Sequence, residues 1–128
     1  MQDLYRFHGK NVLYIARVHD TIPLYKYGTT HNLYKRLEKK NAYPAFNLEY
    51  VKPVRGKEII EQLFTHDLIY RKLYTTHVFE GQKEGKLIML PFGNNINLTD
   101  ITHIIDDISK FADDKLNLNE FMFDSDSE

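Results

Sequence analysis

The stretch YKYGTTHNLYKRL, residues 25–37, decides the fold that this sequence can adopt. Its first half alternates aromatic and polar residues as a β-strand does and reaches a glycine, Gly28. Its second half places Leu33 and Leu37 four residues apart, which is the spacing of one helix face. Thr30 can cap this helix, which we expect over residues 31–40. The stretch therefore predicts a strand that ends in glycine and leads directly into a helix.

A second strand is predicted just before this stretch. Residues 11–18, NVLYIARV, are rich in β-branched and aromatic residues, and turn-forming residues separate them from the strand at 23–28. The two strands should form an antiparallel hairpin. If its loop has three residues, Tyr14 lies directly opposite Lys26 and on the same face of the sheet.

The middle of the chain predicts one more strand and a long helix. Residues 45–54 alternate apolar and polar positions, and Pro53 restricts this third strand to a sheet edge. From Lys57 to about Leu73 apolar residues recur every four positions, so this helix should be the main one that packs on the sheet.

The last third of the sequence is less regular. The segments YTTHVFE and KLIMLPF are either short strands or irregular structure, and the apolar stripe in ITHIIDDISKF predicts an amphipathic helix. The expected fold is α+β, with a small antiparallel sheet of about three strands flanked by helices and an extra C-terminal helix. We expect a globular domain over residues 1–96, this helix over 97–115, and an acidic, disordered tail over 116–128.

Composition limits the class of protein. The chain has 128 residues, no cysteine, and no apolar run long enough to cross a bilayer. The first ten residues lack the apolar core of a secretory signal, so we expect an intracellular protein that is not inserted in a membrane.

Charge is distributed unevenly along the chain. Residues 1–90 carry 15 Lys and Arg against 9 Asp and Glu, whereas residues 91–128 carry 2 against 9. A basic body fits a polyanionic partner, although a solvated charged surface explains the same excess. The acidic end can repel or compete with nucleic acid.

Four residues in the first half follow an order that is similar to one enzyme family. Tyr14 lies in the first strand, Gly28 ends the second, Arg36 lies on the next helix, and Glu61 lies early in the long helix. In this order the chain resembles the GIY-YIG nuclease superfamily, with VLYI at the first motif and KYG at the second. The KYGTTHNLYKRL run is similar to the T5orf172-type branch, in which Lys commonly replaces the first residue of the second motif.

The resemblance implies a metal-dependent endonuclease that hydrolyses DNA phosphodiester bonds. Glu61 would hold one Mg²⁺ or Mn²⁺, Arg36 would bind phosphate, and Tyr14 would position or deprotonate the attacking water. Lys26, if it lies beside Tyr14, would lower the pKa of that tyrosine or contact phosphate. The phosphate backbone would be held by four basic residues, His31, Lys35, Lys39 and Lys40, with Lys52, Arg55 and Lys57 as further candidates. Relatives of this kind are often carried by viruses or mobile elements, and sequence specificity would need another domain, a partner or a homodimer.

Other interpretations remain open at this point. Each motif residue has a structural explanation, and Glu58 competes with Glu61 for the role of metal ligand. The chain could also be a catalytically silent nucleic-acid-binding module of the same fold. A third interpretation is a protein-interaction module that uses the apolar stripe of the C-terminal helix, provided that the stripe is exposed.

Overall fold

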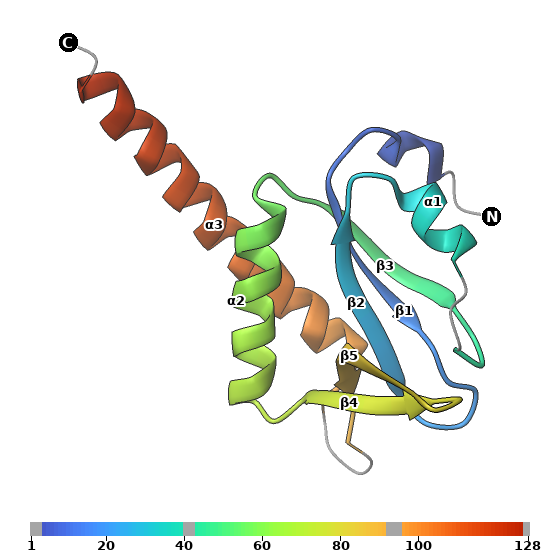
Figure 1. Ribbon diagram of the computed structural model, residues 1–128. Coiled ribbons are helices and arrows are strands. Elements are labelled where there is room, and N and C mark those ends of the chain that lie inside the picture. The colour runs from blue at the N-terminus through green and yellow to red at the C-terminus, as the bar shows by residue number, and fades with distance from the viewer. Residues whose placement is uncertain (1–3, 40–42, 92–95, 127–128) are drawn as a thin grey trace.

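The computed structural model describes residues 4–39, 43–91 and 96–126 as one α+β fold (Figure 1). Its elements, in chain order, are the short 3-10 helix η1 (Leu4–Phe7), β1 (Val12–Arg17), β2 (Leu24–Thr30), α1 (Leu33–Glu38), β3 (Asn47–Pro53), α2 (Lys57–Tyr70), β4 (Tyr74–Phe79), β5 (Gln82–Met89) and α3 (Leu98–Asp126). Among these described helices, none is both long and apolar enough to span a membrane.

The sheet has five antiparallel strands in the order β3-β1-β2-β5-β4, and the expectation of about three strands is wrong. The two additional strands come from the segments that the sequence left ambiguous. They pair through a two-residue turn in which Glu80 and Gly81 both have positive φ, at 49° and 81°. This backbone suits a tight hairpin, but Glu-Gly is a weaker sequence signal for it than Asn-Gly or Asp-Gly. β3 lies at a sheet edge, as Pro53 predicted.

The β1–β2 hairpin forms as predicted, but its register differs by two residues. Tyr14 pairs with Gly28, and Lys26 pairs with Ala16. The backbone N–H of Val18 donates to the carbonyl of Leu24 at 3.0 Å, so the connecting loop has five residues and not three. Because side chains alternate with a period of two, this shift still leaves Tyr14 and Lys26 on one face.

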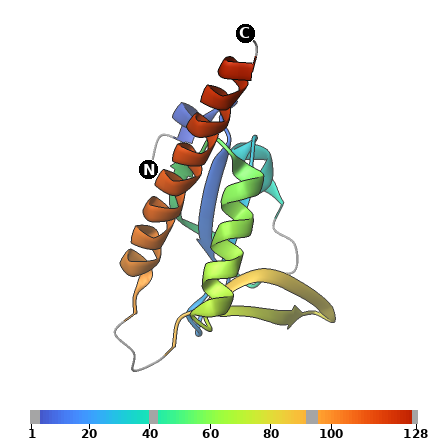
Figure 2. The same cartoon turned by 90° about the vertical axis from the view of Figure 1, so that its left-hand side faces the viewer.

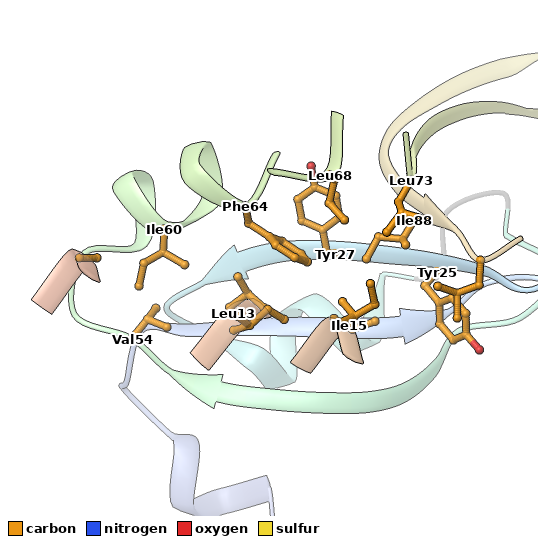
Figure 3. Packing of buried hydrophobic residues seen from close by; sticks show 14 residues of the cluster. Leu13, Ile15, Tyr25, Tyr27, Val54, Ile60, Phe64, Leu68, Leu73 and Ile88 are labelled. Carbon is orange, nitrogen blue, oxygen red and sulfur yellow. The ribbon is translucent and has the colours of Figure 1, made fainter. Parts of the chain in front are cut away.

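The long helices α2 and α3 cover one face of the sheet, and α1 and η1 lie on the other (Figures 1 and 2). Ile60, Phe64 and Leu68 of α2 are fully buried against Leu13 and Ile15 of β1 (Figure 3). The alternate residues of β1 face the other way, where Val12 and Tyr14 pack with Leu33 and Phe7. The sheet therefore separates two clusters, and Tyr14 points away from α2.

The helix after β2 begins slightly later than predicted. Its N-cap is Asn32 and not Thr30, because the Asn32 side chain accepts a hydrogen bond from the Lys35 backbone at 3.1 Å. The Thr30 hydroxyl instead accepts from the Asn32 backbone at 3.1 Å. Both residues thus order the turn that connects β2 to α1.

The C-terminal helix packs on the body and then extends beyond it (Figure 1). Ile101 and Ile105 are fully buried in the main core, and Lys52 on β3 pairs with Asp106 at 3.1 Å. The apolar stripe is thus largely covered within the chain, although Phe111 remains half exposed. α3 also continues to Asp126, so residues 116–126 are helical where we expected a disordered tail.

Candidate active site

The candidate site surrounds the end of β2, where this strand pairs with β1 on one side and, in the part of the chain that the structure describes, has no partner strand on the other. β5 pairs with β2 over Leu24–Lys26, and β2 then continues alone on that side to Thr30. A cleft of about 390 Å³ opens along this stretch between the two helical layers. Its charged lining comprises four cations, Lys26, Arg36, Lys39 and Lys86, and two carboxylates, Glu61 and Glu84. The cleft therefore has an excess of positive charge, which suits an anionic ligand.

Tyr14 and Arg36 meet at one wall of the cleft. The Arg36 Nε donates to the Tyr14 hydroxyl at 2.7 Å, and its guanidinium lies 4.6 Å from the centre of the Phe46 ring. A second guanidinium nitrogen, Nη1, donates to the Lys39 carbonyl at 2.9 Å. These contacts hold the Arg36 plane in one orientation, and its remaining N–H donors can bind a ligand.

Gly28 allows Tyr14 to reach the cleft. A Cβ at position 28 would lie 2.8 Å from the Tyr14 hydroxyl oxygen and 3.1 Å from the ring carbon that bears it. The φ of Gly28 is not in the left-handed region, so glycine serves here to leave space and not to permit an unusual backbone. Gly28 on β2 thus lacks a side chain where the Tyr14 ring from β1 passes over it.

We expect Gly28→Ala to displace Tyr14 and to break its contact with Arg36. Crowding of this kind costs about 1–3 kcal/mol, so the free energy of unfolding should fall by that amount. Chemical denaturation measures this change in the free energy of unfolding, with Gly28→Ala introduced into the wild-type protein and into the Tyr14→Ala variant. Because Tyr14→Ala removes the clashing ring, Gly28→Ala should cost much less in that background. Equal costs in both backgrounds would show that the glycine does not accommodate Tyr14.

Burial raises the pKa of Tyr14 above its ordinary value, and the charge and hydrogen bond of Arg36 oppose this shift only in part. The phenol is therefore neutral at neutral pH. Lys26 is not the cation at this hydroxyl, and the expectation that it lowers the pKa of Tyr14 is wrong. The cause is the hairpin register, which brings Gly28 and not Lys26 opposite Tyr14.

Lys26 lines the same cleft. Its Nζ donates to the Gly85 carbonyl at 2.9 Å. Burial, and after it the nearby charge of Lys86, lower the pKa of Lys26 to about 8. Lys26 is thus a cation whose charge changes close to physiological pH.

Glu61 enters the cleft from α2, on the opposite side of the sheet from Tyr14. Its Oε2 accepts from the Thr29 hydroxyl at 2.5 Å, and its Oε1 forms an ion pair with Lys86. Burial alone would raise the pKa of Glu61, but the hydrogen bonds from Lys86 and Thr29 outweigh it and the net pKa is lowered. Glu61 is therefore ionised at neutral pH. Its charge also contributes to the raised pKa of Tyr14, as expected for two groups that share one cleft.

Lys86 is the site residue that sequence reasoning missed. It lies with Gly85 in the bulge where the β4–β5 register shifts, and its φ is 55°. A bulge of this kind re-aims a side chain, here toward Glu61. The dipeptide Gly85-Lys86 hints at an irregular strand, but nothing in its spacing relates it to α2.

The predicted phosphate-binding residues lie next to the cleft. His31 and Lys35 line a hollow of about 220 Å³ that shares Thr30, Arg36 and Lys39 with it. Lys40 lies outside the described residues. The further candidates do not line the cleft: Lys52 pairs with Asp106, and Arg55 lines a separate hollow beside α3.

A second hollow, of about 380 Å³, meets the cleft at Thr29, Glu61 and Lys86. Glu58 and His66 line this hollow but not the cleft itself. Of the two glutamates that compete as metal ligands, Glu61 is thus the one that faces Tyr14 and Arg36.

The donor set fits a weakly coordinated, hard divalent ion. Within the described residues, no three or more His, Asp or Glu side chains gather into a metal site. Mg²⁺ commonly takes one or two carboxylates, keeps several waters and completes its coordination with substrate phosphate. The ionised Glu61 carboxylate is an oxygen ligand of the kind that such an ion takes, and in the ion-free protein its two oxygens contact Lys86 and Thr29.

Comparison of this chain with protein-family models, with curated proteins and with solved structures returns no match.

Proposed function

We propose that this protein is a GIY-YIG-like endonuclease that hydrolyses DNA phosphodiester bonds with one Mg²⁺ or Mn²⁺ ion. The observation that carries the proposal is the arrangement of Tyr14, Arg36 and Glu61, which come from three different elements and two sides of the sheet and line one cationic cleft. In the sequence they are 22 and 25 residues apart.

Arg36 would bind the scissile phosphate. A guanidinium offers five N–H donors in a planar fork, and the contacts to Tyr14 and Lys39 account for Nε and one donor on Nη1. The others can reach phosphate oxygens and stabilise the charge that develops on them during attack. Lys26 and Lys39 add positive charge at the same place.

Tyr14 would position the attacking water. Because Arg36 donates to its oxygen, the Tyr14 hydroxyl can turn its own hydrogen toward another acceptor in the cleft. The raised pKa favours this orienting role over that of a base in the ion-free protein. Glu61 would hold the divalent ion, which supplies Lewis-acid stabilisation of the phosphate when bound.

The most direct experiment incubates the purified protein with supercoiled plasmid and with branched DNA, in Mg²⁺, in Mn²⁺ and in chelator. We expect nicked or linear products with the divalent ions and none with chelator. Intact DNA under all conditions, with DNA binding that survives chelation, would favour the silent binding module instead.

The observation that favours the silent binding module is the Glu61–Lys86 pair, because an ammonium already occupies the carboxylate. The interaction-module interpretation loses its specific support, since Ile101 and Ile105 of the apolar stripe pack inside the chain.

A pH dependence follows from Lys26. Its pKa of about 8 means that its charge is present below pH 8 and is lost as the pH rises through that value. DNA affinity in chelator should therefore fall roughly three- to tenfold more between pH 7 and pH 9 than in Lys26→Arg, which stays charged. Fluorescence anisotropy at fixed ionic strength measures this. Parallel pH profiles for both proteins would show that the Lys26 ammonium does not contact DNA.

A further inference from the structure

Lys86 forms an ion pair with the only carboxylate that we assign to the divalent ion. Its side chain is about half exposed, at 51%, whereas that of Glu61 is 17% exposed. A lysine that is half exposed on a flexible stem can move, while the glutamate is fixed at Oε2 by Thr29. The mobile partner of this pair is thus the ammonium.

The backbone around Lys86 is built to hold that ammonium in the cleft. The Gly85 carbonyl accepts from Lys26, and the Lys86 N–H donates to the Tyr74 hydroxyl at 3.3 Å. A φ of 55° is unfavourable for lysine by about 1–2 kcal/mol, so the surrounding contacts must select it. This one bulge therefore positions two cations, Lys26 through its carbonyl and Lys86 through its side chain.

Electrostatics determines what an added divalent ion would meet. An ammonium and a divalent cation at one carboxylate oxygen repel each other, and of the two acidic side chains that line the cleft, Glu61 and Glu84, Glu61 is the one that pairs with Lys86. Binding of the ion at Glu61 therefore requires Lys86 to leave. The cleft into which Lys86 would then extend is the one that already contains Lys26 and Arg36.

We propose that Lys86 and the divalent ion exclude each other at Glu61, so that binding of the ion releases the Lys86 ammonium to a phosphate of the bound strand. The inference rests on the proposed function for the identity of the ligand. In the ion-free protein, Lys86 would hold the Glu61 carboxylate in place. In the ion-bound protein, it would be a positioning residue that contacts the DNA phosphate.

The test measures Mn²⁺ binding without DNA, by electron paramagnetic resonance of free Mn²⁺, so that its readout does not depend on cleavage. Lys86→Met should tighten Mn²⁺ binding roughly three- to tenfold by removing the competing cation. Lys83→Met, which removes a lysine from the same strand outside the cleft, should leave it unchanged. Glu61→Gln should abolish it. Lys86→Gly, which adopts positive φ readily, provides a second variant if the methionine protein folds poorly.

A second measurement follows the released ammonium. With Ca²⁺, a hard ion that takes oxygen ligands, Lys86→Met should weaken DNA binding, whereas in chelator it should have a much smaller effect because Glu61 neutralises Lys86 there.

The outcomes separate the two proposals. Unchanged or weaker Mn²⁺ binding in the Lys86 variants, with loss in Glu61→Gln, overturns the exclusion while leaving the nuclease proposal intact. Tighter binding in those variants supports the exclusion even if no DNA is cut. An absence of Mn²⁺ binding in every protein overturns both the exclusion and the ion site.

Discussion

Tyr14→Phe should lower the rate of ion-dependent DNA cleavage by about 10²-fold, the loss expected when the attacking water is no longer held in position. The substitution removes one oxygen that accepts from Arg36 at 2.7 Å and leaves the ring in its cluster with Val12 and Leu33. The effect should therefore be on the rate and not on folding. Single-turnover cleavage with excess protein measures the rate, and DNA affinity in chelator should change little.

Tyr25→Phe is the matched control for this prediction. Tyr25 is buried in the same sheet, but in the cluster beneath α2 and α3 and not in the cleft. The Tyr25→Phe protein should cleave DNA at the wild-type rate. If Tyr14→Phe also cleaves at the wild-type rate, the tyrosine has a packing role alone and the proposed mechanism is wrong.

Arg36→Lys should produce a loss of similar size, about 10²-fold or more, although it keeps the positive charge. The guanidinium donates to Tyr14 and Lys39 and lies over the Phe46 ring, and it can do this while still presenting donors to phosphate. An ammonium is a compact point charge that cannot make these contacts together. Single-turnover rates should fall while the net charge of the cleft is unchanged.

The control for Arg36→Lys is Arg71→Lys, the same exchange at an exposed pair with Asp67 on the surface of α2. This variant should retain wild-type cleavage. An Arg36→Lys protein that cuts normally would mean that charge alone is needed at position 36, and the planar fork would have no role.

Local patterns predicted three of the five strands, α1, α2 and the start of α3. The hairpin, the edge strand and the positions of α2 and of the start of α3 follow from alternation, from four-residue spacing and from Pro53, because these signals depend on residues close in sequence. The hairpin register did not follow. Side chains of the loop and of the strand before it close the five-residue loop: Arg17 donates to the His19 carbonyl at 3.0 Å, and the His19 ring accepts from the Thr21 backbone at 3.2 Å. No glycine or Asn-Gly pair marks such a loop.

The sequence predicted four residues of the candidate site but not Lys86. Tyr14, Lys26, Arg36 and Glu61 line one cleft. The two-residue register shift keeps Tyr14 and Lys26 on one face of the sheet, but it places Gly28 and not Lys26 opposite Tyr14. Lys86 could not be found, since its approach to Glu61 depends on how β5 diverges from β2 and on one residue with positive φ. Long-range approach of this kind is fixed by tertiary packing and leaves no periodic trace in the sequence.

The measurement that tests the central claim most directly compares Glu61→Gln with Glu58→Gln in Mn²⁺-dependent plasmid cleavage. Both residues lie in the first half of α2, but of the two only Glu61 lines the cleft with Tyr14 and Arg36. The proposed site predicts that Glu61→Gln abolishes cleavage and that Glu58→Gln cuts at the wild-type rate. Cleavage that persists in Glu61→Gln, or that is lost in Glu58→Gln alone, would contradict a nuclease site centred on Glu61.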